Sequence, residues 1–268
     1  MVPVEMRTPP HVSFTQVDQY LRCPLKYRFT YVDCLEPEFA PAALVFGSGI
    51  HGAAAFLYRR LAQGTPTAVA DVQGYFETLW TLEAEHRPIQ YGEKESKATL
   101  LDLGTKMLAV LCAHVDPAAE IVAVEQPFSV PLIDVETGEV LERDLVGSLD
   151  RLERDAEGQL VVVDLKTAAR KYTSLQVEAS LQLSVYSYAT SMNGLADQED
   201  LRLRFDVLTK TKQPELHRYW TTRDQAANRR LFRLVAEVLH AIEAGVFHPN
   251  PGWQCPGCPF RSRCWVWG

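Results

Sequence analysis

Apolar residues follow two different spacings along this chain of 268 residues. In the first part they recur every three or four positions, the spacing of amphipathic helices. We predict four helices there, over 14–23, 44–64, 67–87 and 96–115. Ser13 is suited to cap the first helix, and Gly64 is suited to follow the end of the second.

From residue 120 onward the apolar residues alternate with polar ones, which is typical of strands. Turn signals at Thr137-Gly138 and Glu157-Gly158 separate the first three strands. The predicted order is strands over 120–132, 139–155 and 159–167, a helix over 174–192, strands over 201–210 and 216–222, and a helix over 228–245.

This order predicts an α/β or α+β fold with a mixed sheet. We expect a single domain over 1–268. Its predicted parts are a helical region (13–116), a β-β-β-α-β-β core (120–222), and a final helix with a cysteine-bearing tail (223–268).

Composition and charge limit the binding partners and the cellular compartment that we expect for this domain. Hydrophobic residues make up 47% of the chain, which is ample for a core, and the net charge is −7. No overall basic field therefore indicates nucleic-acid binding, although a local basic groove is compatible with this charge.

The sequence shows neither a membrane-spanning apolar run nor a signal-peptide pattern at its start, so we expect a cytoplasmic protein without membrane contacts. In a reducing compartment, six cysteines favour metal ligands or core residues over disulfides.

Two carboxylates face each other in the second predicted hairpin. If its turn centres on Glu157, Asp150 lies opposite Asp164 with Cβ atoms about 5 Å apart. Lys166 projects from the same face, two residues further on. The register of the preceding hairpin, in which Pro131 favours a bulge, places Glu125 beside Asp150.

Clustered carboxylates repel each other, and a hard divalent cation such as Mg²⁺ or Mn²⁺ relieves the repulsion. The alternative is that Asp150 and Asp164 lie on a solvated sheet face. Asp164 follows the apolar run "LVVV", which places it at the edge of a buried strand, where an unpaired charge is costly.

Four motifs together resemble the RecB-like branch of the PD-(D/E)XK nuclease superfamily, which includes CRISPR-associated exonucleases. "GSLDR" is similar to the family's G-x-x-D-R motif, and "VDLKT" to its D/E-x-K motif. The resemblance implies a restriction-endonuclease-like core with Asp150, Asp164 and the Leu165 carbonyl as metal ligands and with Lys166 as a catalytic residue.

The two remaining motifs lie on predicted helices. "QLSVY" resembles the family's Q-x-x-x-Y motif, which implies that Gln182 and Tyr186 lie near the site, although an i, i+4 pair is also compatible with plain packing. "GSGIH" resembles the upstream histidine motif and implies His51 as a further metal ligand. The family often has glutamate four residues after this histidine, where this chain has Ala55.

Three cysteines near the end of the chain are spaced C-x2-C-x5-C, one thiolate short of a four-ligand site. Iron–sulfur members of the same branch add a cysteine near the N-terminus. The resemblance therefore implies a [4Fe-4S] cluster held by Cys23, Cys255, Cys258 and Cys264. Zinc is the rival occupant, Cys34 is an alternative N-terminal ligand, and Cys112 is expected in the core.

The resemblance implies a Mg²⁺- or Mn²⁺-dependent DNA exonuclease that acts on single strands or DNA ends, in repair, recombination or CRISPR adaptation. A helicase or a CRISPR integrase is the implied partner. One alternative is a catalytically silent iron–sulfur DNA-binding or scaffold subunit, and another is a zinc-stapled interaction protein. Further candidates for DNA contact are Arg170, Lys171, Tyr172, Lys210 and Lys212.

Overall fold

The computed structural model describes residues 9–267, so residues 1–8 and 268 of the predicted domain lie outside the described part. Contacts divide the chain into two compact units, and each is considered by itself. The first unit contains the described residues up to 39, together with 128–147 and 224–267. The second contains 40–127 and 148–223.

The first unit joins segments from both ends of the chain. It contains β1 (Val12–Ser13), α1 (Phe14–Arg22), α2 (Pro24–Tyr27), a π-helical turn (Arg28–Val32), α8 (Gln225–Glu243), a 3-10 turn (Cys255–Gly257) and α9 (Arg261–Trp265). Ser13 caps α1 as predicted, because its hydroxyl accepts a hydrogen bond from the Gln16 amide and its own amide donates one to the Gln16 side-chain oxygen. The Leu25 amide donates to the His248 carbonyl, which ties the two ends of the chain together.

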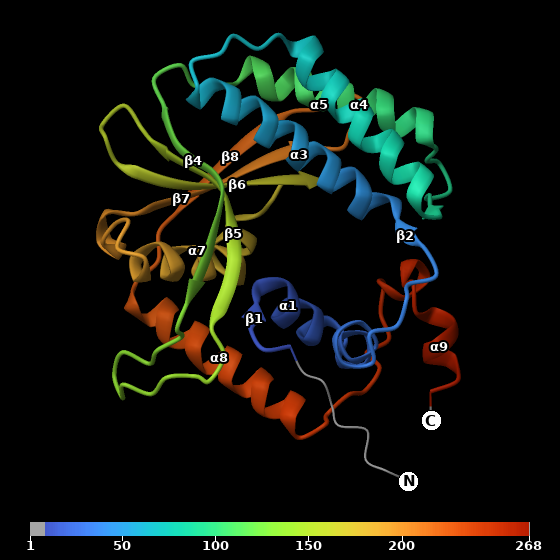
Figure 1. The fold of residues 1–268 in the computed structure, drawn as a ribbon, viewed down its shortest axis with the longest axis vertical. Coiled ribbons are helices and arrows are strands. Elements are labelled where there is room, and N and C mark those ends of the chain that lie inside the picture. The colour runs from blue at the N-terminus through green and yellow to red at the C-terminus, as the bar shows by residue number, and fades with distance from the viewer. Residues whose placement is uncertain (1–8, 268) are drawn as a thin grey trace. The chain divides into compact units, whose positions relative to one another are not determined.

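The second unit contains a helical layer and most of the sheet (Figure 1). Its helices are α3 (Ala42–Ala62), α4 (Val69–His86), α5 (Lys97–Ala113), α6 (Ser174–Glu178), α7 (Leu181–Met192) and a 3-10 turn (Gln198–Asp200). Its strands are β6 (Leu160–Ala168), β7 (Arg202–Thr209), β8 (Leu216–Thr221) and a short pair, β2 (Ala40–Pro41) with β3 (Ile89–Gln90). Strands β4 (Glu120–Val130) and β5 (Leu145–Arg154) run through both units.

The main sheet of the described residues is mixed, as the sequence predicted. Its order is β1-β5-β6-β7-β8, with β4 also paired to β5. β6 and β7 are parallel, whereas β5 with β6 and β7 with β8 are antiparallel. The α/β prediction is therefore confirmed.

The β5–β6 hairpin has the predicted register. Arg151 pairs with Val163 and Arg154 with Leu160, so the hairpin is centred on Glu157, and Gly158 takes the positive φ of +80° that the turn requires. Continued by one residue, the same register places Asp150 opposite Asp164.

Helices α3, α4 and α5 pack together over one face of the sheet (Figure 1). Phe76 of α4 packs into two gaps left by glycines, because a Cβ on Gly49 or Gly104 would lie within 3 Å of its ring. Leu165 and Leu208 contribute sheet residues to this core, and Cys112 packs against it as predicted. Since neighbouring residues of a strand point to opposite faces, Lys166 and α7 lie on the face opposite Leu165 and α3–α5.

The predicted helix over 174–192 is in fact two helices, α6 and α7. Ser180 separates them because its hydroxyl accepts a hydrogen bond from the Leu183 amide and so caps α7. Within residues 9–267, no helix combines the length and apolar character that crossing a membrane requires.

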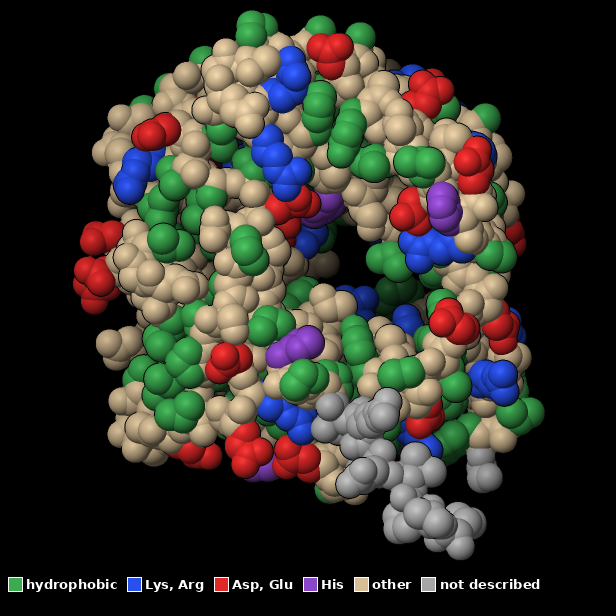
Figure 2. Space-filling model, viewed as in Figure 1, with side chains coloured by type: hydrophobic (Ala, Val, Ile, Leu, Met, Phe, Trp, Pro, Cys, Tyr) green, Lys and Arg blue, Asp and Glu red, His purple; other side chains and the backbone are tan. Residues whose placement is uncertain are grey.

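Figure 2 shows acidic, basic and hydrophobic side chains interspersed over the visible face. This mixture agrees with the moderate net charge and indicates no extended basic field on that face.

Candidate functional site

The centre of the second unit brings together six of the side chains predicted as site residues. His51 comes from α3, Asp150 from β5, Asp164 and Lys166 from β6, and Gln182 and Tyr186 from α7. Four elements supply these residues, two neighbouring strands of the sheet with α3 on one face and α7 on the other.

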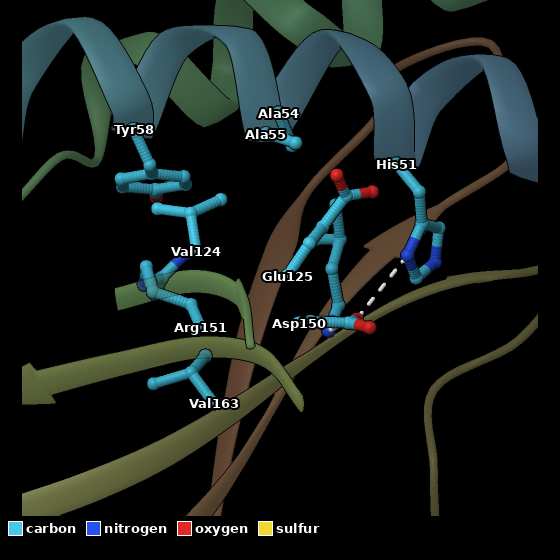
Figure 3. A pocket seen from close by; sticks show the side chains of 10 residues that line it. His51, Ala54, Ala55, Tyr58, Val124, Glu125, Asp150, Arg151 and Val163 are labelled. Atoms are coloured by element: carbon cyan, nitrogen blue, oxygen red, sulfur yellow. Dashed lines mark hydrogen bonds and ion pairs between the residues drawn. The ribbon is translucent and has the colours of Figure 1, made fainter. Parts of the chain in front are cut away.

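His51 and Asp150 form the first pair of the site (Figure 3). The His51 Nδ1 atom lies 3.2 Å from Asp150 Oδ2, and the Leu165 amide donates a 3.0 Å hydrogen bond to the same oxygen. Burial opposes ionisation of Asp150, but the hydrogen bond and charge of His51 outweigh it and lower the pKa of this carboxyl. Burial likewise acts to lower the pKa of His51, but Asp150 overcomes this effect and raises it.

Asp164 and Lys166 form the second pair. Asp164 is fully buried, and the Lys166 ammonium lies 2.7 Å from its Oδ2 atom. The contact with Lys166 is an ion pair, and the Tyr186 hydroxyl also interacts with the Asp164 carboxyl. Burial raises the pKa of Asp164 to about 6, with Asp150 adding repulsion and Lys166 opposing the shift.

Helix α7 orients the lysine. The Lys166 ammonium donates a 2.6 Å hydrogen bond to Gln182 Oε1, and the Gln182 amide donates a 2.8 Å hydrogen bond to the Tyr186 hydroxyl. Burial acts to lower the pKa of Lys166, but the charge of Asp164 reverses this effect and raises it. Burial also raises the pKa of Tyr186 well above its usual value, so the phenol stays protonated and able to donate.

A buried ion network beneath the site was not predicted from the sequence. Arg151 and Glu153 of β5 meet Arg204 and Asp206 of β7, with ion-pair distances from 2.7 to 3.0 Å, and all four side chains are buried. The Arg151 guanidinium also lies 3.8 Å from the ring centroid of Tyr58 on α3. This network ties the strand of Asp150 to the helix of His51. Its only sequence signal was the arginine of "GSLDR".

The donor set suits a hard divalent cation. Asp164 offers two buried carboxylate oxygens beside the Lys166 ammonium, and Asp150 and His51 add oxygen and nitrogen donors next to it. Among residues 9–267, however, no group of three or more His, Cys, Asp or Glu side chains lies close enough to hold a metal ion as it stands. At this site Lys166 is paired with Asp164, and His51 is paired with Asp150.

The four cysteines predicted as cluster ligands surround one cavity in the first unit. Cys23, Cys255, Cys258 and Cys264 line a cavity of about 460 Å³, together with Leu25, Phe29 and Phe260. None of them forms a disulfide. Burial raises the pKa of the Cys264 thiol, and the other three cysteines raise it further. Cys34 is exposed and does not line this cavity.

Two of the other residues predicted to contact DNA make contacts within the protein. Lys171 lies 3.1 Å from Glu215, and Tyr172 packs edge-on against Phe205 with ring centroids 5.6 Å apart. Arg170 and Lys212 are exposed. Their proposed contacts with DNA stay predictions.

Comparison with known proteins gives a consistent family match. A sequence model of the PD-(D/E)XK nuclease superfamily matches residues 11–265. A crystal structure from Eubacterium rectale, described as that of a candidate exonuclease, is similar over 93% of this chain and 87% of its own, with a TM-score of 0.58 and 12% identity. This identity supports the fold alone. The crystal structure of SSO0001 is 15% identical over 93% of this chain and 94% of its own, but its TM-score of 0.38 is too low to indicate a shared fold. No curated protein matched the chain.

Proposed function

We propose, from the premise that this chain belongs to the PD-(D/E)XK nuclease superfamily, that it is a divalent-metal-dependent DNA exonuclease. Nucleases of this superfamily typically use Mg²⁺ or Mn²⁺. The observation that carries the proposal is the convergence of His51, Asp150 and Asp164 with the Lys166 ammonium. The expected substrates are single strands or DNA ends in repair, recombination or CRISPR adaptation, with a helicase or a CRISPR integrase as partner. The cytoplasmic location stays a prediction.

In the proposed mechanism, Asp150, Asp164 and His51 would hold the cation, with the Leu165 carbonyl as a candidate fourth ligand. When bound, the cation lowers the pKa of a water molecule and neutralises charge on the scissile phosphate. Asp164 is suited to this task because its fully buried carboxylate lies beside the Lys166 ammonium and close to Asp150.

Lys166 acts on the reacting groups. Gln182 holds its ammonium, and Tyr186 in turn contacts Gln182, so α7 fixes the position of the charge. With a cation on Asp164, the ammonium is free to face the attacking water or the phosphate, where negative charge grows in the transition state.

We also propose that Cys23, Cys255, Cys258 and Cys264 hold a [4Fe-4S] cluster. Support comes from their shared cavity and from the mutual repulsion of their thiolates, which a cationic group relieves. Because Cys23 is 232 residues from Cys255, the cluster would close a long loop and stabilise the first unit. We further propose that both units belong to one nuclease domain, because the family match spans them.

Digestion of end-labelled DNA tests the nuclease proposal. Anaerobically purified protein is incubated with single- and double-stranded DNA in Mg²⁺, Mn²⁺ or EDTA. We expect stepwise shortening from an end with either metal and no cleavage in EDTA or with Asp150→Ala. Wild-type protein that binds DNA but never cuts it would favour the silent scaffold, and internal cleavage of circular DNA would contradict a strict exonuclease.

A further inference from the structure

The pocket beside His51 and Asp150 contains one acidic side chain to which the proposed mechanism gives no role. Glu125 of β4 lines this pocket, and its carboxylate points toward α3 between Ala55 and His51 (Figure 3). Its φ of +50° lies in the left-handed region, and among the described residues Cys34 is the only other non-glycine with a positive φ. This backbone conformation directs Glu125 into the pocket.

The pocket is the size of a single small occupant. Its volume is about 20 Å³, close to what one water molecule or small ion requires. On the α3 side its wall is formed by Ala54 and Ala55, whose short side chains leave room for the carboxylate of Glu125. Opposite this wall lies the Asp150 carboxylate, which is already bonded to His51.

The partner of Glu125 is easily exchanged. Its carboxylate pairs with Arg59, two turns beyond His51 on α3. The two side chains are 47% and 50% exposed, and ion pairs this exposed contribute little to stability. A divalent cation in the pocket can therefore take the carboxylate from Arg59.

We propose that Glu125 is an additional ligand of the catalytic divalent cation, bound directly or through a water molecule. The inference rests on the proposed function and adds a residue to its site. A hard cation takes six or more ligands and prefers oxygen, and Glu125 brings a third carboxylate to the side of the pocket where α3 contributes Ala54 and Ala55. Arg59 competes with the cation for this carboxylate and is released when the cation binds.

Calorimetric titration of the EDTA-treated, dialysed full-length protein with Mn²⁺, without DNA, tests the proposal. We expect Glu125→Gln to weaken Mn²⁺ binding about tenfold, because a neutral amide is a poor ligand for a hard cation. We expect Arg59→Ala to strengthen binding by up to about fivefold, because it removes the competitor. The opposite signs separate ligation from a structural ion pair, since the loss of a structural pair would give both variants the same effect.

Three further variants make the outcome decisive. Glu120→Gln, an exposed glutamate on the same strand, should leave Mn²⁺ affinity unchanged. Glu125→Gly removes the carboxylate but favours the positive φ, so it should fold well and still lose affinity. Asp150→Asn reports on the site itself and should abolish binding.

The outcomes distinguish the two proposals. If Asp150→Asn abolishes binding while both Glu125 variants keep wild-type affinity, the role of Glu125 is wrong and the nuclease site stands. If Arg59→Ala weakens binding as much as Glu125→Gln, Glu125 acts through its ion pair and the inference is overturned. If Asp150→Asn binds Mn²⁺ as tightly as the wild type, or if the wild type binds no Mn²⁺, the proposed site fails as well.

Discussion

The carboxylate site of the second unit and the cysteine cavity of the first unit differ in how their acidic side chains are paired. At the carboxylate site every acid meets a cationic side chain, so Asp150 faces His51 and Asp164 faces Lys166. In the cavity four free thiols share one mainly apolar lining, to which Lys26 and Arg261 contribute the cationic side chains. The carboxylate site is therefore electrostatically balanced before any ion binds, whereas the cavity depends on an added group to neutralise its thiolates.

This difference predicts different consequences of metal loss. Removal of the divalent cation should stop the chemistry and leave the second unit folded, because His51 and Lys166 neutralise the acids. Removal of the cysteine-bound group should loosen the first unit, because nothing else links the four sulfurs. The following four predictions test this contrast, beginning with the largest effect.

Lys166→Ala should reduce single-turnover cleavage by about 10³-fold or more, because the ammonium faces charge that grows in the transition state. Equilibrium DNA binding should stay within about fivefold of wild type, since ground-state contacts remain. Lys166→Arg should rescue poorly because the planar guanidinium does not fit the place of a compact ammonium. Lys106→Ala, an exposed lysine paired with Asp102, is the control and should cleave normally. Undiminished cleavage in Lys166→Ala would remove this lysine from the mechanism.

Cys258→Ser should lower the iron content from about four atoms per chain to near zero and remove the brown colour. Its melting temperature should fall because the closed loop between the chain ends is lost. Iron analysis and thermal denaturation of anaerobically purified protein provide the measurement. Cys112→Ser, a cysteine that packs against the helical core, should keep the iron. Stoichiometric zinc without iron in the wild type would replace the cluster by a tetrahedral zinc site.

Asp206→Asn should lower the free energy of unfolding by about 3–5 kcal/mol, because it breaks a buried ion network and leaves Arg151 and Arg204 undercompensated. Urea denaturation provides the measurement. Asp102→Asn, in the exposed pair with Lys106, should change stability by less than about 1 kcal/mol. Equal effects of the two substitutions would mean that the network does not hold the second unit together.

Asp164→Asn should stabilise the metal-free protein in EDTA at pH 8. Because burial raises the pKa of Asp164 to about 6, the folded state binds its proton more tightly than the unfolded state does. At low pH, protonated Asp164 therefore contributes on the order of 3 kcal/mol to the free energy of unfolding. This contribution falls as pH rises toward 6 and is lost above it.

Relative to the wild type, Asp164→Asn should have a clearly higher free energy of unfolding at pH 8 and a similar one at pH 4. Urea denaturation of both proteins at the two pH values measures the difference, in which the titration of His51 and Asp150 largely cancels. Destabilisation at pH 8 would show that the Lys166 ion pair outweighs the burial of Asp164.

Much of the fold followed from the sequence because the signals were local. Apolar residues spaced three to four apart predicted the helices, and alternating ones predicted the strands. Ser13 predicted the cap of α1, and the turn at Glu157 predicted the register that places Asp150 opposite Asp164. The helix break at Ser180 was missed because a serine within an otherwise helical run is a weak signal until its hydroxyl is seen to accept the Leu183 amide.

The partners of the site residues were decided by the tertiary structure. No spacing in the sequence brings Arg151 onto Tyr58, pairs Asp206 with Arg151, or sets Glu125 against Ala55, because these contacts join elements that are separated by tens of residues. The sequence determined which groups carry charge and which strand faces they share. How deeply each charge is buried, and hence the raised pKa of Asp164 and the lowered pKa of Asp150, depends on the layers that α3 and α7 place over the sheet.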